Sequence, residues 1–103
     1  MAGTRLFVHE DIYQVVLNGV KEIAEAFTVG HGLISGNDFG PLISKTQKER
    51  VMSYIDLGRE EGAELLTGGD SFSDQGHFVQ PTIFSNVDGE MRIAKEEIFG
   101  PVL

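Results

Sequence analysis

The sequence contains no cysteine among its 103 residues. The absence excludes disulfide bonds, thiolate metal sites and thiol nucleophiles from these residues, because all three need the cysteine sulfur. A reaction that proceeds through a thiolate is therefore excluded for this chain acting alone.

Basic residues are also scarce: 8 Lys and Arg face 16 Asp and Glu, a formal net charge of -8. Nucleic acids and anionic membranes are bound by clustered positive charge, so we expect neither as a partner. No apolar run is long enough to span a bilayer, and Met1 to Arg5 does not resemble a secretory signal. Cytoplasmic is the default expectation.

Metal-ligand spacing and common catalytic motifs are missing as well. His9, His31 and His77 form no HxxxH or HExxH pattern, so we expect surface or turn positions and no metal. The glycines of residues 30–36 do not fit GxGxxG, and no Gly-x-Ser-x-Gly elbow occurs. On physical grounds the pair Glu96 and Glu97 is most simply exposed surface, because adjacent helical residues point in different directions.

What is present is a regular helical pattern. Apolar residues recur at helical spacing over residues 11–27, which predicts an amphipathic helix packed on a core: Ile12, Val16, Val20, Ile23 and Phe27. Ser44 and Gln47 fit a capping box for a second helix that runs to about Glu61, with Gly62 as its left-handed cap. The expected buried face of this second helix is Val51, Met52, Tyr54, Ile55 and Gly58.

Extended segments lie before, between and after these helices. Residues 5–9, 63–67 and 82–87 predict strands, with Pro81 excluded from the continuous part of the last strand. Glycine-rich residues 29–41 predict a long loop, and Asp88 is expected to cap a short helical turn over residues 91–96. The fold class predicted is α/β: a strand-helix-helix-strand-strand segment of an open, mainly parallel sheet.

Five collinear segments resemble the NAD(P)-dependent aldehyde dehydrogenases. They are Ala2-Gly3-Thr4-Arg5-Leu6-Phe7-Val8, Phe39-Gly40-Pro41-Leu42-Ile43-Ser44, Glu61-Gly62-Ala63-Glu64-Leu65-Leu66-Thr67-Gly68-Gly69, Phe78-Val79-Gln80-Pro81-Thr82-Ile83-Phe84 and Glu96-Glu97-Ile98-Phe99-Gly100-Pro101-Val102. Because they follow the family's order over essentially the whole chain, residues 1–103 are expected to be one part of a catalytic domain.

The resemblance also implies residue roles. Ala2-Gly3-Thr4-Arg5 matches the end of the family's nucleophile motif Gly-Gln-x-Cys-x-Ala-Gly-Thr-Arg, so the catalytic cysteine is expected just before Met1 and no catalytic residue within the chain. Glu97 matches the glutamate that hydrogen-bonds the nicotinamide ribose hydroxyls of NAD or NADP. Phe99 matches the aromatic residue beside that ribose and ring.

Two functions follow as expectations. The first is a fragment of an enzyme that oxidises an aldehyde to a carboxylic acid, inactive alone and without tight cofactor binding, because the thiol and the dinucleotide-binding domain are absent. The alternative is an interaction module that associates with itself or completes the catalytic domain of a partner chain, since a cut through a sheet exposes strand edges and apolar faces.

Overall fold

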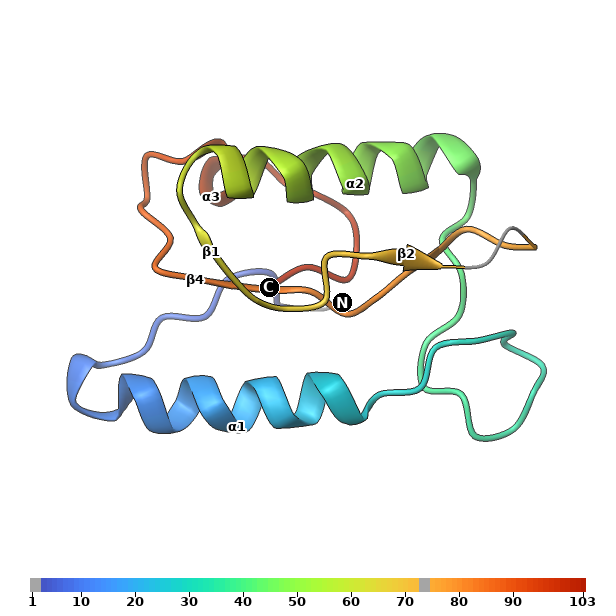
Figure 1. Cartoon of the computed structure of the whole chain (residues 1–103), viewed down its shortest axis with the longest axis horizontal. Helices are drawn as coiled ribbons and strands as arrows, with labels where there is room; N and C mark the ends of the chain where they lie inside the picture. The colour runs from blue at the N-terminus through green and yellow to red at the C-terminus, as the bar shows by residue number, and fades with distance from the viewer. Residues whose placement is uncertain (1–2, 73–74) are drawn as a thin grey trace.

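The computed structural model describes residues 3–72 and 75–103. The helical elements of these ranges are η1 (Glu10–Ile12), α1 (Tyr13–Ala26), α2 (Lys45–Glu60) and α3 (Arg92–Lys95). The strands are β1 (Glu64–Thr67), β2 (Ser71–Phe72), β3 (Phe78–Val79) and β4 (Ile83–Ser85). The chain is thus a mixed α/β structure, as the sequence predicts, in which α1 and α2 cover opposite faces of the strands (Figure 1).

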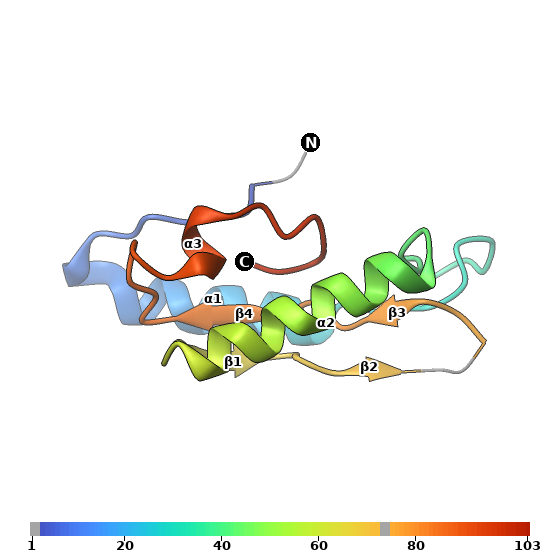
Figure 2. The same ribbon diagram turned by 90° about the horizontal axis from the view of Figure 1, so that it is seen from above.

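The strands form an antiparallel ribbon with an irregular middle (Figure 2). Leu65 of β1 pairs with Phe84 of β4, and Phe72 of β2 pairs with Phe78 of β3. The expectation of mainly parallel strands is wrong for these pairs. The segment between β1 and β4 is a β2–β3 hairpin rather than a crossover helix, so the chain returns in the opposite direction.

Parallel pairing occurs in the described residues only as isolated bridges, Thr82 with Val102 and Val29 with Phe39. Thr82 N donates to Pro101 O over 2.8 Å and Leu103 N donates to Thr82 O over 2.9 Å, which places the C-terminal residues along the free side of β4. Pro81 lies outside the strands, as predicted, because it has no N–H to contribute to the ribbon.

The strand predicted over residues 5–9 is not formed, because this segment pairs with no strand in the part of the chain that the structure describes. A β-prone sequence makes a strand only where a neighbouring backbone supplies hydrogen bonds. Phe7, in this segment, has an exposed fraction of 92%.

One face of α2 forms the core, as predicted. Val51 and Ile55 are completely buried, while Tyr54 and Gly58 are buried beside them and Met52 is only half-buried. A Cβ atom on Gly58 would lie 2.9 Å from Phe84 Cζ, so glycine allows α2 to approach β4 closely.

The first helix forms where it was predicted, beginning as the single 3₁₀ turn η1 and continuing as α1 to Ala26. Its apolar stripe, however, is covered only in part: Val16 and Val20 are half-buried, Ile23 has an exposed fraction of 60%, and none of the residues of α1 is fully buried. In the described residues the stripe therefore contributes one wall of an open surface rather than a closed core.

The caps predicted for α2 at Ser44 and Gly62 are formed, but the Gln47 side chain does not complete the predicted capping box, and the cap predicted for α3 is wrong. Ser44 Oγ accepts from Gln47 N over 3.1 Å, and Gly62, with φ +94°, follows the end of α2. At α3 the Glu61 carboxylate accepts from Arg92 N, both oxygens at 3.0 Å, while Asp88 Oδ1 accepts from Glu90 N. A carboxylate from 31 residues upstream thus caps this helix, which local sequence spacing does not reveal.

Candidate functional site

The segment Glu96–Val102, here called the motif loop, follows α3 and packs against the first half of α2 (Figure 2). Ile98 and Val102 are buried and fix the motif loop to the core. A Cβ atom at Gly100 would lie 2.5 Å from Val51 Cγ2, so only glycine fits at this position without movement of the helix. The loop is therefore held close to α2 along its length.

Side chains on one face of α2 bind this loop. Gln47 Nε2 donates to Phe99 O and Arg50 Nη2 donates to Glu97 O, each over 2.7 Å. Tyr54 donates its hydroxyl to a carboxylate oxygen of Glu96. Spacings of three and four residues place the three donors on the same side of a helix. The loop conformation is thus set by α2 rather than by the motif sequence alone.

Glu96 is anchored on two sides. Besides the Tyr54 hydroxyl, it accepts from Arg92 Nε at 2.8 Å and Arg92 Nη2 at 3.2 Å. The hydrogen bonds from Arg92 and then from Tyr54 lower the pKa of Glu96 from 4.5 to about 2. Glu96 is therefore an ionised carboxylate at neutral pH that points back into the scaffold.

The side chain of Glu97 shares none of the hydrogen-bond partners of Glu96. Its side chain is half-buried, and its Oε2 atom accepts from Thr4 Oγ1 at 3.5 Å, the limit of a hydrogen bond. A carboxylate has about four lone-pair directions, so this single long contact leaves most of its acceptor capacity for a ligand.

Phe99 combines an exposed ring with an uncommon backbone. Its exposed fraction is 69% and its φ is +59°, in the left-handed region that bulky residues seldom adopt. Such a conformation persists where the surroundings impose it, here through Gln47 and the close packing of Gly100. The ring of Phe99 is therefore held facing away from the core.

The structure brings Glu97 and Phe99 onto the same anchored loop, on either side of buried Ile98. Pattern analysis did not find the residues that position them. Tyr54 was expected only as core, and Gln47 as the second partner of a capping box, whereas its side chain bonds Phe99 O instead. The sequence did contain a signal for these contacts. Positions 47 and 50 are polar, although they lie on the face of the helix that also carries buried Val51 and Tyr54.

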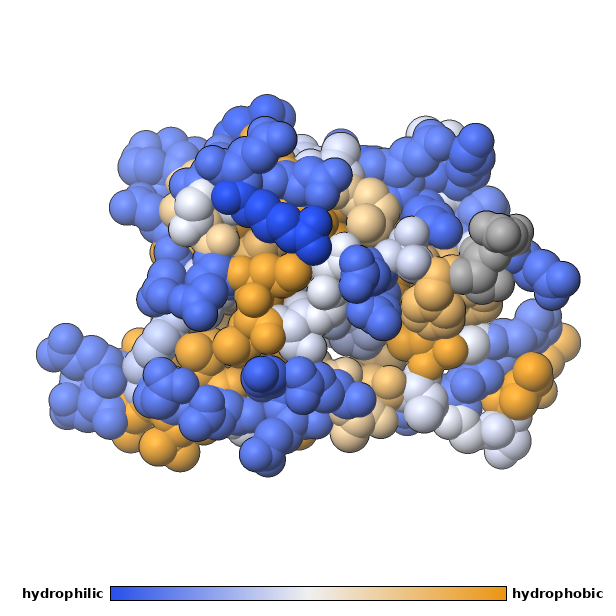
Figure 3. Space-filling view, viewed as in Figure 1, coloured by the Kyte–Doolittle hydropathy of each residue, from blue (hydrophilic) through white to orange (hydrophobic). Residues whose placement is uncertain are grey.

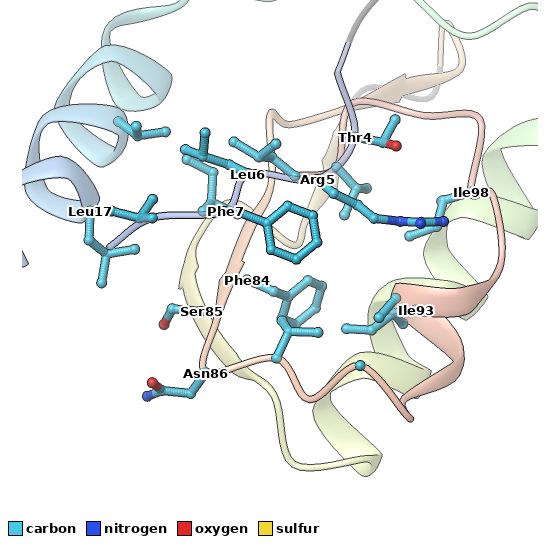
Figure 4. A pocket seen from close by; sticks show the side chains of 18 of the residues that line it. Thr4, Arg5, Leu6, Phe7, Leu17, Phe84, Ser85, Asn86, Ile93 and Ile98 are labelled. Atoms are coloured by element: carbon cyan, nitrogen blue, oxygen red, sulfur yellow. The ribbon is translucent and has the colours of Figure 1, made fainter. Parts of the chain in front are cut away.

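An open trough lies beside Glu97, with a volume of about 480 Å³. Its walls are the segment Thr4–Val8, α1, β4 and α3, and Figure 4 shows Phe7, Phe84 and Ile93 among its lining side chains. Apolar residues gather between α1 and α3 on the face drawn in Figure 3. The hydroxyl of buried Ser85, also in the lining, has no hydrogen-bond partner in the described residues.

Neither metal chemistry nor a role for histidine is indicated by the residues that the structure describes. No group of three His, Asp or Glu side chains in them could hold a metal ion. His9 Nδ1 accepts from Asp11 N and His31 Nδ1 accepts from Leu33 N, both at 3.2 Å, which confirms the expected turn positions for these two.

Across residues 3–72 and 75–103, no helix is long and apolar enough to cross a membrane.

The family model described as "Aldehyde dehydrogenase family" matches residues 1–103, and the chain belongs to that family. The family resemblance deduced from the five sequence segments is thereby confirmed. Of these segments, only Ala2, the first residue of the first segment, falls outside the described residues.

Relatives match over nearly the whole of this chain. The mitochondrial aldehyde dehydrogenase of Leishmania tarentolae is 52% identical over 101 residues, which cover 98% of this chain and 20% of that protein. The cytosolic aldehyde dehydrogenase 1 of Mus musculus is 49% identical over 102 residues, 99% of this chain and 20% of its own length. The chain therefore spans about a fifth of the length of the relatives it matches.

Solved structures show the same fold for this segment. The NAD+ complex of the Bacillus cereus aldehyde dehydrogenase matches with a TM-score of 0.96 and 44% identity, over 99% of this chain and 21% of that chain. A betaine aldehyde dehydrogenase of Staphylococcus aureus, also in complex with NAD+, matches with a TM-score of 0.95 and 32% identity, over 99% of this chain and 21% of its own. NAD+ is thus a ligand of related enzymes.

Proposed function

We propose that residues 1–103 form part of the catalytic domain of an NAD(P)-dependent aldehyde dehydrogenase and supply its contacts to the nicotinamide end of the cofactor. The observation that carries the proposal is the motif loop: α2 holds it through Gln47, Arg50 and Tyr54, so that Glu97 and Phe99 are presented together. The parent reaction is the oxidation of an aldehyde to a carboxylic acid.

The residues fit the ribose and ring of such a cofactor. Glu97 has free acceptor capacity for two neighbouring hydroxyls, and the exposed Phe99 ring supplies an apolar surface for the sugar and the nicotinamide. The cofactor, when bound, accepts a hydride from the substrate. The role of this chain is to orient the ring through the ribose and to exclude water from one side of it.

By itself the chain should catalyse nothing and bind the cofactor weakly. It contains no cysteine to attack an aldehyde, and two contacts are too few to replace the groups that hold a dinucleotide's phosphates. Purified chain is mixed with NAD and an aldehyde, and NADH formation is compared with that of the E97A variant. Turnover above this control would contradict the proposal of an inactive fragment.

The cofactor contact itself is tested in a complete enzyme. The matching segment of the Bacillus cereus aldehyde dehydrogenase is replaced by this chain, and Glu97→Ala is compared with Glu90→Ala, an exposed glutamate that pairs with Lys95. We expect a rise in KM for NAD for Glu97→Ala only, about tenfold from the loss of hydrogen bonds to a charged acceptor. Equal KM values for NAD in the two variants would refute the contact.

The complete domain is further proposed to contain the open, mainly parallel sheet. The parallel bridge between Thr82 and Val102 supports this, because it starts a parallel neighbour for β4 on the side away from β1. The cytoplasmic location stays a prediction, since the relatives include both cytosolic and mitochondrial proteins.

A second candidate function is association through the trough, either with another copy or with the rest of an aldehyde dehydrogenase. The observation that favours it is the apolar lining, together with the exposed Phe7 ring and the Ser85 hydroxyl, which has no partner among the residues that the structure describes. Light scattering should then show a species larger than one chain, or mixing with the remaining part of the enzyme should restore activity. A strict monomer without complementation would reject this candidate.

A further inference from the structure

The two adjacent glutamates of the motif loop have opposite surroundings. The Glu96 side chain is bound by Tyr54 and Arg92, whereas the Glu97 side chain makes one long contact, to Thr4, within the described residues. We propose that Tyr54 is a positioning residue that acts through Glu96 to hold Glu97 in its cofactor-binding orientation. The inference rests on the proposed function, because it concerns the same carboxylate.

Tyr54 is suited to this role by its place in the core. The residue is 8% exposed and lies between the fully buried Val51 and Ile55, so its ring has little freedom to move. A tyrosine side chain has only two rotatable angles, and its hydroxyl position is fixed once the ring is packed. The hydroxyl that binds Glu96 is therefore a rigid reference point on α2.

Arg92 completes the anchor but could not provide it alone. Its ion pair with Glu96 lies at the surface, with side chains 59% and 38% exposed, and exposed pairs hold their geometry weakly. Arg92 also belongs to α3, the short helix that leads directly into the motif loop. Without the Tyr54 hydroxyl, both partners of the pair could move together with the loop.

The anchor acts on Glu97 through the peptide that joins the two residues. The Glu96 side chain is fixed before this peptide, and Arg50 Nη2 binds Glu97 O after it. The Arg50 guanidinium in turn stacks over the Tyr54 ring, 4.9 Å from its centroid. Tyr54 therefore contacts both the Glu96 side chain and the Arg50 side chain that binds the backbone of Glu97.

The test uses the complete chimaeric enzyme described above and compares Tyr54→Phe with Tyr13→Phe. Tyr13 is a matched control, because its hydroxyl also makes a hydrogen bond, accepting from Asn86 N at 3.2 Å, away from the motif loop. Each variant removes one hydroxyl and keeps the ring. We expect Tyr54→Phe to raise KM for NAD about three- to tenfold and to leave KM for the aldehyde unchanged, and Tyr13→Phe to change neither.

A double variant separates positioning from general stability. If Tyr54 acts through Glu97, then Tyr54→Phe should add no further increase in KM for NAD to the Glu97→Ala variant. Glu96→Ala, which leaves the buried tyrosine untouched and removes the acceptor of its hydroxyl, should reproduce the rise seen with Tyr54→Phe and keeps the test valid if that variant folds poorly.

The outcomes distinguish the two proposals. An unchanged KM for NAD in both Tyr54→Phe and Glu96→Ala, or effects that add to Glu97→Ala, would overturn the positioning role while leaving the cofactor contact in place. No effect of Glu97→Ala itself would overturn the proposed function and the positioning role with it.

Discussion

Gln47, in the first turn of α2, donates its side-chain amide to the carbonyl oxygen of Phe99, 52 residues later, over 2.7 Å. This hydrogen bond joins the start of a core helix to the residue with the left-handed backbone and the exposed ring. It explains how the motif loop keeps a conformation that an aromatic residue seldom adopts without help.

Removal of this bond should loosen the loop. For Gln47→Ala we expect a loss of about 1 kcal/mol in the free energy of unfolding, measured by urea titration of the chain. Gln14→Ala is the control, because Gln14 bonds only Asn18 on the exposed surface of α1. The control should lose less than half as much, and equal losses would mean that the Phe99 bond contributes nothing particular.

Gly100 should not tolerate a side chain. A Cβ atom there would lie 2.5 Å from Val51 Cγ2, so Gly100→Ala forces the motif loop away from α2. We expect a destabilisation of about 1 to 3 kcal/mol, typical of overpacking. Gly40→Ala is the matched control, since its added Cβ would meet nothing within 4 Å.

A second substitution tests the cause. In the Gly100→Ala background, Val51→Ala removes the clashing methyl groups, so the double variant should lose less stability than the sum of the two single variants. Full additivity of the two losses in urea unfolding would show that the contact between positions 51 and 100 is not the source of the effect.

The Glu96 anchor should give the chain an acid-dependent stability. The folded-state pKa of Glu96 is lowered from 4.5 to about 2, so its contribution is present above pH 4.5 and is lost as the pH falls toward 2. The difference in urea midpoint between the unsubstituted chain and Glu96→Gln should therefore be largest near neutral pH and shrink over this interval.

The titration of a second carboxylate, that of Asp38, must be separated from the titration of Glu96. The pKa of Asp38 is also lowered, first by the hydrogen bond from the Thr28 backbone N–H and then by that from the Thr28 hydroxyl. Because Asp38 is present in both chains, its titration cancels in the difference. A difference between the chains that stays constant from neutral to acidic pH would contradict the anchor.

The core on α2 predicts where substitution is most harmful. Ile55 is completely buried, and Ile55→Ala should cost about 2 to 5 kcal/mol through lost burial and the cavity left behind. Val15→Ala, at a position with an exposed fraction of 75%, should change stability by less than about 0.5 kcal/mol. Similar urea midpoints for the two variants would mean that α2 does not form the core.

The helices could be predicted because their signals are local. The apolar spacing before Phe27, the serine at position 44 and the glycine at position 62 each act within one or two turns, and the structure places α1 and α2 where these signals indicated. The strand pairing could not be predicted in the same way. Whether β4 runs with or against β1 depends on the β2–β3 hairpin between them.

The candidate site shows the same division between local features, which the sequence predicts, and long-range contacts, which it does not. The burial of Tyr54 follows from its helical position, but its bond to Glu96 joins residues 42 apart and has no local signature. Glu61 caps α3 in place of the expected Asp88 for the same reason. Glu97 and Phe99 were identified by family resemblance, and physical reasoning from the sequence alone had assigned the glutamate pair to ordinary surface.

Three side chains of α2, those of Gln47, Arg50 and Tyr54, and the carboxylate of Glu61 directly after α2 bind the segment from Arg92 to Phe99. The segment is therefore attached to α2 near both of its ends, through Glu61 at Arg92 and through Gln47 at Phe99. A displacement of α2 relative to the ribbon would therefore displace both the Glu97 carboxylate and the Phe99 ring. The positions of the two proposed cofactor contacts thus depend on the position of one helix.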